Sequence, residues 1–222
     1  MSLVVLRERG LGASRECGNP GDTGYPEGMT ISSLNALVAR LESVEALDGP
    51  GRTVGRTVRA LIPRGAPKDV LSGAWLGHAV HPIMTDLPIG AWTSSVLLDW
   101  MGGKDSRSAS DRLIVAGVLA AGLTVVTGWS DWADVEERDA AVRRAGLVHA
   151  GANATATGLM LGSYLARRRG ERGRGKLLSL AGSAALGAGG WLGGHLSYTL
   201  GAGVTASAPA ARTQATTATE SA

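Results

Sequence analysis

Four long apolar stretches, each bounded by charged residues, dominate the hydrophobic pattern of the chain. Asp86 and Asp99 are the only formal charges inside them. A helix that crosses a bilayer needs about 20 mostly apolar residues, because all of its backbone groups must bond within the helix. The connections are short enough to make neighbouring helices antiparallel. The stretches cover residues 83–101, 113–130, 145–166 and 177–200. We therefore expect an all-α integral membrane protein, with a four-helix bundle formed by residues 71–204.

Aromatic and basic residues mark the ends of these predicted spans. Aromatic rings with a polar edge prefer the membrane interface, and Asp99, beside Trp100, is interpreted as interfacial. The connections on one side, including the basic run 167–176, carry more Lys and Arg than the other side, unless the arginines of residues 29–70 are counted. The positive-inside rule then places the protein in the cell membrane with four spans and both termini outside. The basic run also suits binding of anionic lipid. The marker aromatics are Trp75, Trp100, Trp129, Trp132, Tyr164 and Tyr198.

The segments that flank the predicted bundle are polar or amphipathic. Residues 1–28 are rich in chain-breaking residues and predict a disordered leader, with Met29 as a candidate start. Within residues 29–70, apolar side chains recur at helical spacing over 31–47, which predicts an amphipathic helix. A Gly-Pro-Gly sequence at 49–51 ends this predicted helix. Three arginines then share a helical face, which suits either an interfacial helix on an anionic membrane or a helix packed on the protein. The low-complexity tail 205–222 is expected to be disordered.

Glycine is unusually frequent, with 33 residues in a chain that has no phenylalanine. Glycines four residues apart in the third and fourth spans let helices approach closely in lipid. A smooth glycine face also suits a flat cofactor. The helix-packing positions are Gly158, Gly162, Gly189, Gly190, Gly193 and Gly194.

All four histidines fall at one end of the predicted bundle. His78 and His81 precede the first span, His149 lies early in the third and His195 late in the fourth. Antiparallel threading brings these points to the same membrane face. At about 1.5 Å per residue, His149 and His195 lie roughly 6 to 8 Å inside the boundary.

Histidines at this depth suggest a ligand site. Two imidazoles on facing helices can bind a haem iron axially, and imidazole also binds transition metals. We expect a cofactor held by His149 and His195 with help from His81; a non-haem metal site would use His78, His81, His149, His195 and Asp86. Alternatively, the histidines bond only to headgroups or helix ends, and Asp86, followed by Leu and Pro, is an N-cap.

Composition and missing motifs narrow the function. The formal charge of +3 is not arranged as a basic stripe interleaved with aromatics, so we expect no nucleic-acid partner. The single cysteine, Cys17, allows neither an internal disulfide nor a cysteine-held iron–sulfur cluster. Phosphate-binding loops, zinc-protease motifs and haem-attachment motifs are absent from the sequence. We therefore expect no stand-alone enzyme.

Three motifs resemble a known family. They are Gly-His-Ala-Val-His-Pro at 77–82, Thr-Asp-Leu-Pro-Ile-Gly-Ala-Trp at 85–92 and Gly-Gly-Trp-Leu-Gly-Gly-His-Leu at 189–196, followed by Tyr198. Over residues 70–204 the chain resembles the bacterial membrane family called domain of unknown function 2231. The resemblance implies a four-helix membrane domain without an established activity, which in some relatives precedes a Rieske iron–sulfur domain.

These observations support two hypotheses. The first is a membrane electron-transfer module that binds haem b or a transition metal through its histidines and serves a separate redox protein, such as a Rieske-type protein. The alternative is a non-catalytic membrane scaffold or assembly factor with no cofactor.

Overall fold

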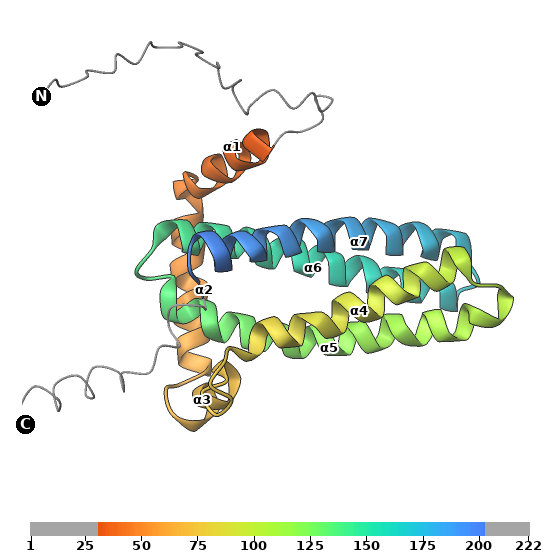
Figure 1. The fold of residues 1–222 in the computed structure, drawn as a ribbon, viewed down its shortest axis with the longest axis horizontal. Helices are drawn as coiled ribbons and strands as arrows, with labels where there is room; N and C mark the ends of the chain where they lie inside the picture. The colour runs from red at the N-terminus through yellow and green to blue at the C-terminus, as the bar shows by residue number, and fades with distance from the viewer. Residues whose placement is uncertain (1–30, 203–222) are drawn as a thin grey trace, which may run out of the picture.

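The computed structural model describes residues 31–202, which fold into helices joined by short connections (Figure 1). In chain order the elements are α1 (Ile31–Glu42), the 3₁₀ turn η1 (Glu45–Leu47), α2 (Asp48–Leu61), α3 (Ala66–Ser72), α4 (Val80–Met101), the 3₁₀ turn η2 (Lys104–Ser106), α5 (Arg107–Val135), α6 (Ala140–Arg168), α7 (Arg172–Gly194) and the π-helical turn η3 (His195–Thr199). Within this part of the chain the all-α expectation is confirmed. The expected disordered leader 1–28 and tail 205–222 lie outside the described residues.

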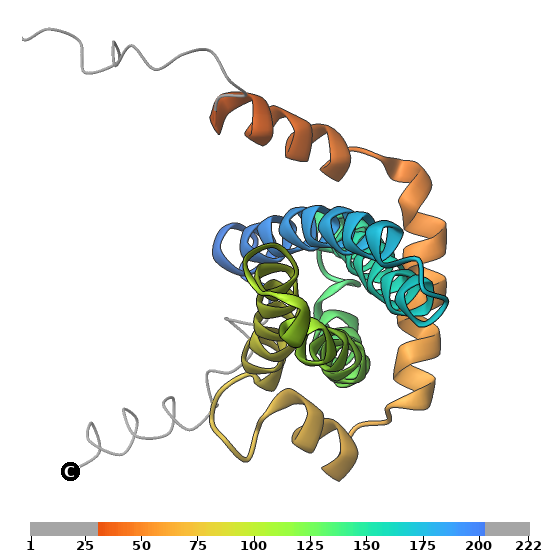
Figure 2. The same ribbon diagram turned by 90° about the vertical axis from the view of Figure 1, so that its right-hand side faces the viewer.

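The four long helices form an antiparallel bundle made of two hairpins. Helix α4 packs mainly on α5, and α6 mainly on α7, with the hairpins side by side (Figures 1 and 2). Helices α4 and α6 begin at what we call the histidine end, which holds His81 and His149. They finish at the ionic end, which holds Asp99 and Arg167. Helix α2 crosses the histidine end and contacts both α5 and α6.

The long helices extend beyond the predicted spans. Helix α5, for example, runs from Arg107 to Val135, whereas the apolar pattern limited this span to residues 113–130. The difference arises because the hydropathy pattern places span boundaries at charged residues, although a charge at a helix end can be paired without ending the helix. Asp111, in the first turns of α5, pairs with Arg167 and Arg172.

The expected helix over 31–47 is wrong in its C-terminal part. Helix α1 ends at Glu42, and the Gly-Pro-Gly sequence lies in the first turn of α2, where proline is well tolerated. Glycine is required because α2 approaches the bundle closely. A Cβ on Gly51 would lie 2.6 Å from Cγ of Arg143, and one on Gly55 would lie 2.1 Å from Oε1 of Glu136.

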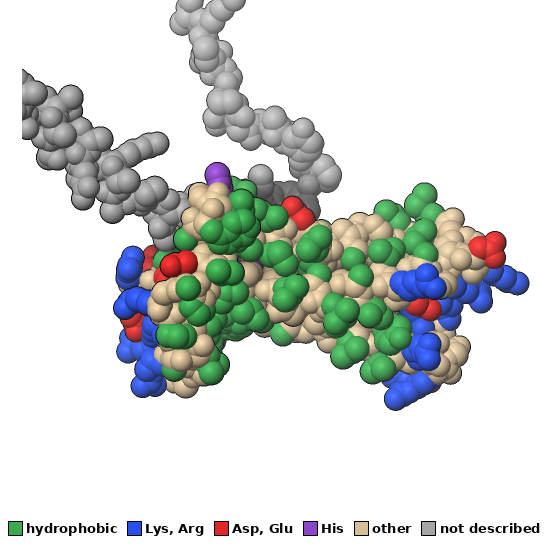
Figure 3. Space-filling view, turned by 90° about the horizontal axis from the view of Figure 1, so that it is seen from below, with side chains coloured by type: hydrophobic (Ala, Val, Ile, Leu, Met, Phe, Trp, Pro, Cys, Tyr) green, Lys and Arg blue, Asp and Glu red, His purple; other side chains and the backbone are tan. Residues whose placement is uncertain are grey.

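The interior of the bundle combines an apolar cluster around Trp92, Ile114 and Met160 with many small and polar side chains, and much of its surface is apolar. Four serines, Ser95, Ser110, Ser163 and Ser179, are fully buried. Large apolar side chains are exposed instead, including Leu97, Leu119, Leu123, Leu161, Leu165 and Leu177. Figure 3 shows hydrophobic side chains along the middle of the bundle, with Lys and Arg gathered at both ends. A bundle in water would bury these leucines, so the pattern is that of a surface suited to lipid.

The second hairpin repeats the first in sequence. Helix α4 aligns with α6 at an offset of 68 residues, with identical residues at Val80, His81, Gly90, Ser95 and Leu97. Helix α5 aligns with α7 at an offset of 65, with identities at Arg107, Leu113, Ala116, Gly117, Ala120, Gly122 and Gly128.

The repeated sequence makes equivalent contacts in each hairpin. The Ser95 hydroxyl donates to the carbonyl of Ser110 at 3.0 Å, and the equivalent Ser163 hydroxyl donates to the carbonyl of Gly175 at 2.7 Å. Because α4 and α6 run in the same direction, the hairpins are related by a pseudo-twofold axis along the bundle. Residues at equivalent positions therefore lie at the same level of the bundle.

Candidate functional site at the histidine end

His81 and His149 occupy equivalent positions and make equivalent hydrogen bonds. Nδ1 of His81 lies 3.1 Å from the carbonyl oxygen of Thr124, and Nδ1 of His149 lies 2.8 Å from that of Gly189. Thr124 and Gly189 are themselves equivalent in the repeat. A carbonyl can only accept, so each Nδ1 donates, and in the neutral ring Nε2 keeps its lone pair. A hydrogen bond from the second ring nitrogen to a carbonyl is typical of metal-binding histidines.

A glycine accommodates each imidazole. A Cβ added to Gly128 would lie 2.6 Å from Cε1 of His81, and one added to Gly193 would lie 2.9 Å from Cε1 of His149. These glycines are equivalent in the repeat. Each hairpin therefore holds its histidine ring in the same way, against a site where no larger residue fits.

The surroundings of the two rings are partly polar. His81 Nδ1 also lies 3.3 Å from the Thr127 hydroxyl. On the other hairpin, the Asn153 amide nitrogen lies 3.1 Å from His149 Nε2 and donates to it. The repeat thus places His81 and His149 at the same level of the bundle, one in each hairpin.

The other candidate ligands lie elsewhere. His195 Nε2 is 2.6 Å from Oε1 of Glu42 on α1, and its ring stacks on Trp191. His78 is exposed, with Nδ1 3.4 Å from the carbonyl of Leu76. His195 is therefore engaged with α1 and not with His149. Among residues 31–202, no group of three or more His, Cys, Asp or Glu is gathered so as to hold a metal ion.

The interpretation of Asp86 as an N-cap is wrong. Helix α4 begins at Val80 with Ala79 as its N-cap, so Asp86 lies exposed inside the helix. Pro88, expected in a first turn, is buried inside the same helix. The Asp-Leu-Pro pattern is misleading here because the helix starts a full turn and more before it.

The predicted helix-packing glycines divide into two groups. Side chains of α6 occupy the space beside Gly189 and Gly193. A Cβ on Gly189 would lie 2.6 Å from Oδ1 of Asn153, and one on Gly193 would lie 2.9 Å from Cε1 of His149. The predicted smooth face therefore accommodates Asn153 and His149. At the remaining positions an added Cβ would have no neighbour closer than 3.8 Å: Gly158, Gly162, Gly190 and Gly194.

The ionic end holds a buried charge network that the sequence pattern did not reveal. Arg167 binds Asp99 through both terminal nitrogens, with Nη1 at 3.0 Å from Oδ1, and these side chains are 1% and 0% exposed. Asp111 accepts from Arg167 and Arg172, both at 3.1 Å. The interpretation of Asp99 as interfacial is therefore wrong, because Arg167 neutralises it inside the bundle.

The repeat contains the missed signal. Asp99 and Arg167 are 68 residues apart, which is the separation of His81 and His149. Aligning the two hairpin sequences by their histidines therefore makes Asp99 of the first hairpin equivalent to Arg167 of the second.

Buried serines, an apolar exterior and paired helical hairpins are features of a membrane-embedded helical bundle. The chain belongs to the family described as predicted membrane protein (DUF2231), whose model matches residues 77–206, more than half of its length. This match confirms the resemblance seen in the sequence. No curated protein and no solved structure matches the chain.

Proposed function

We propose that α4, α5, α6 and α7 all span the membrane. The segment Lys104–Val135 is the one helical segment of the described residues that is long and apolar enough by length and composition, and most of it is not buried within the bundle. Helices α6 and α7 contain more glycine and alanine than α5, and α4 contains two aspartates and two prolines, which lowers their hydropathy without shortening them. The buried serines and exposed leucines support the same environment for all four. The ionic end then faces the cytoplasm, with both termini outside.

Cysteine labelling tests this topology. In a Cys17→Ser background, Asp105→Cys places a thiol in η2 at the ionic end, and Arg138→Cys places one in the exposed α5–α6 connection. A membrane-impermeant maleimide added to intact cells is expected to label position 138 and not 105. Labelling of both positions would overturn the four spans, and the reverse pattern would overturn the orientation.

We further propose that the histidine end binds haem b and that the protein transfers electrons in the membrane. The observation that carries this proposal is the equivalence of His81 and His149. Some haem irons are held by two histidines, and His81 and His149, at equivalent positions of the two hairpins, would supply two identical imidazoles. The fixed Nδ1–H bonds and the glycines under both rings fit such a role. Asn153 would have to release Nε2 of His149 for it to bind iron.

Bound haem would supply one-electron redox chemistry. The chain itself would contribute the two imidazoles, their orientation and an apolar outer surface that keeps the site within the bilayer. A separate redox protein, such as a Rieske-type protein, would be the electron partner. His195, which the sequence suggested as the second ligand, would instead join α1 to the bundle.

The absorption spectrum tests the haem proposal. The full-length protein, expressed with a haem precursor and purified in detergent, is expected to show a Soret band that both His81→Ala and His149→Ala abolish. His195→Ala and His78→Ala are the matched controls and should retain it. A protein without a Soret band, or a band unchanged in both first variants, would overturn the assignment.

A cofactor-free scaffold is the second candidate. It is favoured by the hydrogen bonds of His81 and His149, which already join the two helices of each hairpin. In that case His149→Gln should lower the unfolding temperature of the purified protein without any spectral change. The same variants therefore distinguish the two functions.

A further inference from the structure

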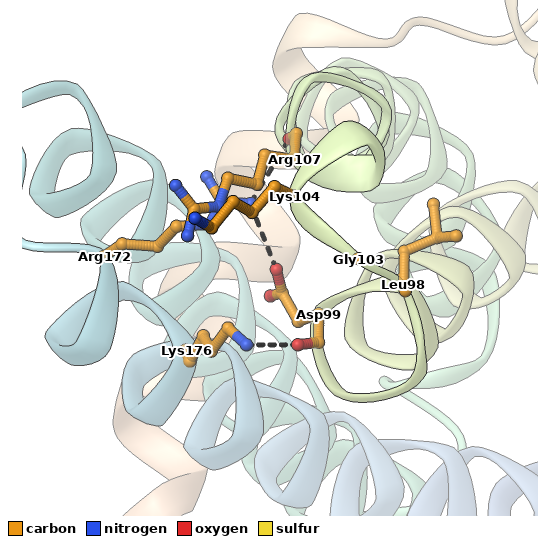
Figure 4. A pocket seen from close by; sticks show the side chains of 8 residues that line it. Leu98, Asp99, Gly103, Lys104, Arg107, Arg172 and Lys176 are labelled. Atoms are coloured by element: carbon orange, nitrogen blue, oxygen red, sulfur yellow. Dashed lines mark hydrogen bonds and ion pairs between the residues drawn. The ribbon is translucent and has the colours of Figure 1, made fainter.

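A cavity of about 200 Å³ lies at the ionic end, between the last turn of α4, η2 and the first turns of α5 and α7. Four cationic side chains line it, Lys104, Arg107, Arg172 and Lys176, together with one carboxylate, Asp99. Figure 4 shows Lys104, Arg107 and Arg172 gathered on one side of Asp99. Like charges repel each other, so a negative charge nearby would stabilise this grouping.

Within residues 31–202, the carboxylates at this end do not balance these cations. Asp99 is bound by the buried Arg167 as well as by Arg172, and Lys176 donates only to the backbone carbonyl of Asp99. The ion pairs of residues 31–202 include neither Lys104 nor Arg107. The cavity therefore has an excess of positive charge.

A buried donor also lacks an acceptor at this cavity. Both terminal nitrogens of Arg172 bond to Asp99 and Asp111. Its Nε is buried and has no hydrogen-bond partner among the described residues. A buried donor without an acceptor is costly, and an oxygen of a bound anion would satisfy it.

We propose that this cavity binds a phosphate group. A tetrahedral oxyanion presents several acceptors to guanidinium and ammonium donors, and arginine binds it through paired N–H groups. The group is either the headgroup of an acidic phospholipid or free inorganic phosphate. The lipid source rests on the proposed four-span topology, in which this end lies at headgroup level. Exposed Trp100, with Lys176 5.5 Å from its ring centre, lies at the same end.

Ligand-dependent thermal unfolding tests the proposal. The delipidated full-length protein is titrated in neutral detergent with inorganic phosphate at constant ionic strength, and separately with phosphatidylglycerol against phosphatidylcholine. At least one of the two anionic probes is expected to raise the unfolding temperature saturably. A rise with phosphatidylglycerol alone identifies the lipid headgroup, and a rise with inorganic phosphate identifies the free anion. No rise with either probe would overturn the proposal.

A matched pair of charge variants locates the site. Lys104→Ala with Arg107→Ala should weaken binding by about tenfold or more, because it removes two charge-assisted hydrogen bonds. The control, Arg168→Ala with Arg169→Ala, removes the same charge from exposed positions at the same end, outside the cavity. Because salt screens exposed charges, this control should change the affinity by less than about twofold. Equal weakening in both would overturn the site. The readout does not involve haem, so failure here is distinguishable from failure of the redox proposal.

Discussion

The two ends of the bundle use equivalent positions of the hairpins in opposite ways. At the histidine end the repeats carry the same residue, His81 and His149, in the same hydrogen-bonded setting. At the ionic end they carry opposite charges, Asp99 in one hairpin and Arg167 in the other, bound to each other. Identical residues about a pseudo-twofold axis suit one shared ligand, whereas opposite residues suit the joining of two different hairpins.

The charge difference also explains why these two hairpins pair with each other. Asp111 in α5 is equivalent to Lys176 in α7, so the first hairpin carries two carboxylates where the second carries two cations. Two copies of the first hairpin would bring buried carboxylates together, which is strongly unfavourable. The ionic end therefore favours pairing of unlike hairpins, while leaving the histidine end symmetric.

Breaking the ionic end should have the largest effect. Arg167→Ala leaves Asp99 buried without its main partner, and removing one member of a buried pair typically costs about 3–5 kcal/mol. The free energy of unfolding in detergent with increasing denaturant measures this loss. The exposed neighbour substitution Arg168→Ala is the control and should be close to neutral.

A double variant separates pairing from packing. Asp99→Leu combined with Arg167→Leu removes both buried charges and should be less destabilised than Arg167→Ala alone. Wild-type stability in the single variant would contradict the assignment of the network as the link between hairpins.

Replacing the glycines that contact the two histidine rings should cause the second-largest loss of stability. Gly193→Ala pushes a Cβ to 2.9 Å from the His149 ring, and such overpacking costs about 1–3 kcal/mol. Gly128→Ala should act similarly on His81, because the sites are equivalent. Gly158→Ala, with nothing near its Cβ position, is the control and should be neutral or stabilising by up to about 1 kcal/mol, since alanine favours helix. Equal stability of all three variants would show that the rings do not need these glycines.

The sequence predicted the histidine end better than the ionic end. Apolar length and antiparallel threading were enough to bring His81 and His149 to one level, because both follow from backbone geometry. Which side chains pair is not contained in hydropathy, and hydropathy alone therefore predicts an interfacial Asp99 and a topology signal at Arg167. The repeat was present in the sequence, but identities are few and mostly small residues, and its meaning rests on the shared contacts of Ser95 and Ser163.

The attachment of the N-terminal helices could not be predicted for a different reason. An amphipathic pattern shows which face of a helix is apolar but not where that face docks. Ser130 and His195 are equivalent in the repeat, and each binds an N-terminal helix, through Lys68 of α3 at 2.9 Å and Glu42 of α1 at 2.6 Å. The sequence suggested His195 as a ligand because its depth matches that of His149, and depth alone does not indicate direction.

The contact of α2 with the histidine end should respond to acid. The Arg144 guanidinium, with Arg143, holds the pKa of Asp48 well below its ordinary value. The ionised form is thus favoured in the folded state, so the contribution to stability is full above about pH 4, the ordinary aspartate value, and is lost as the pH falls toward the lowered pKa. The unfolding temperature of wild type should exceed that of Asp48→Asn at pH 6, with the difference shrinking by pH 3. A constant difference would contradict this account.

The smallest effect is expected at the contact between α1 and η3. Glu42→Gln removes the charge that His195 binds, and because both side chains are partly exposed the loss should be roughly 0–1 kcal/mol. The bundle should stay folded, while protease cleavage between α1 and η1 becomes faster; limited proteolysis with mass spectrometry measures this. Glu45→Gln, at an exposed position in η1, is the control and should leave the cleavage rate unchanged. Because His195 lies outside the symmetric pair, Glu42→Gln should also leave any Soret band intact, and loss of that band would place His195 among the ligands after all.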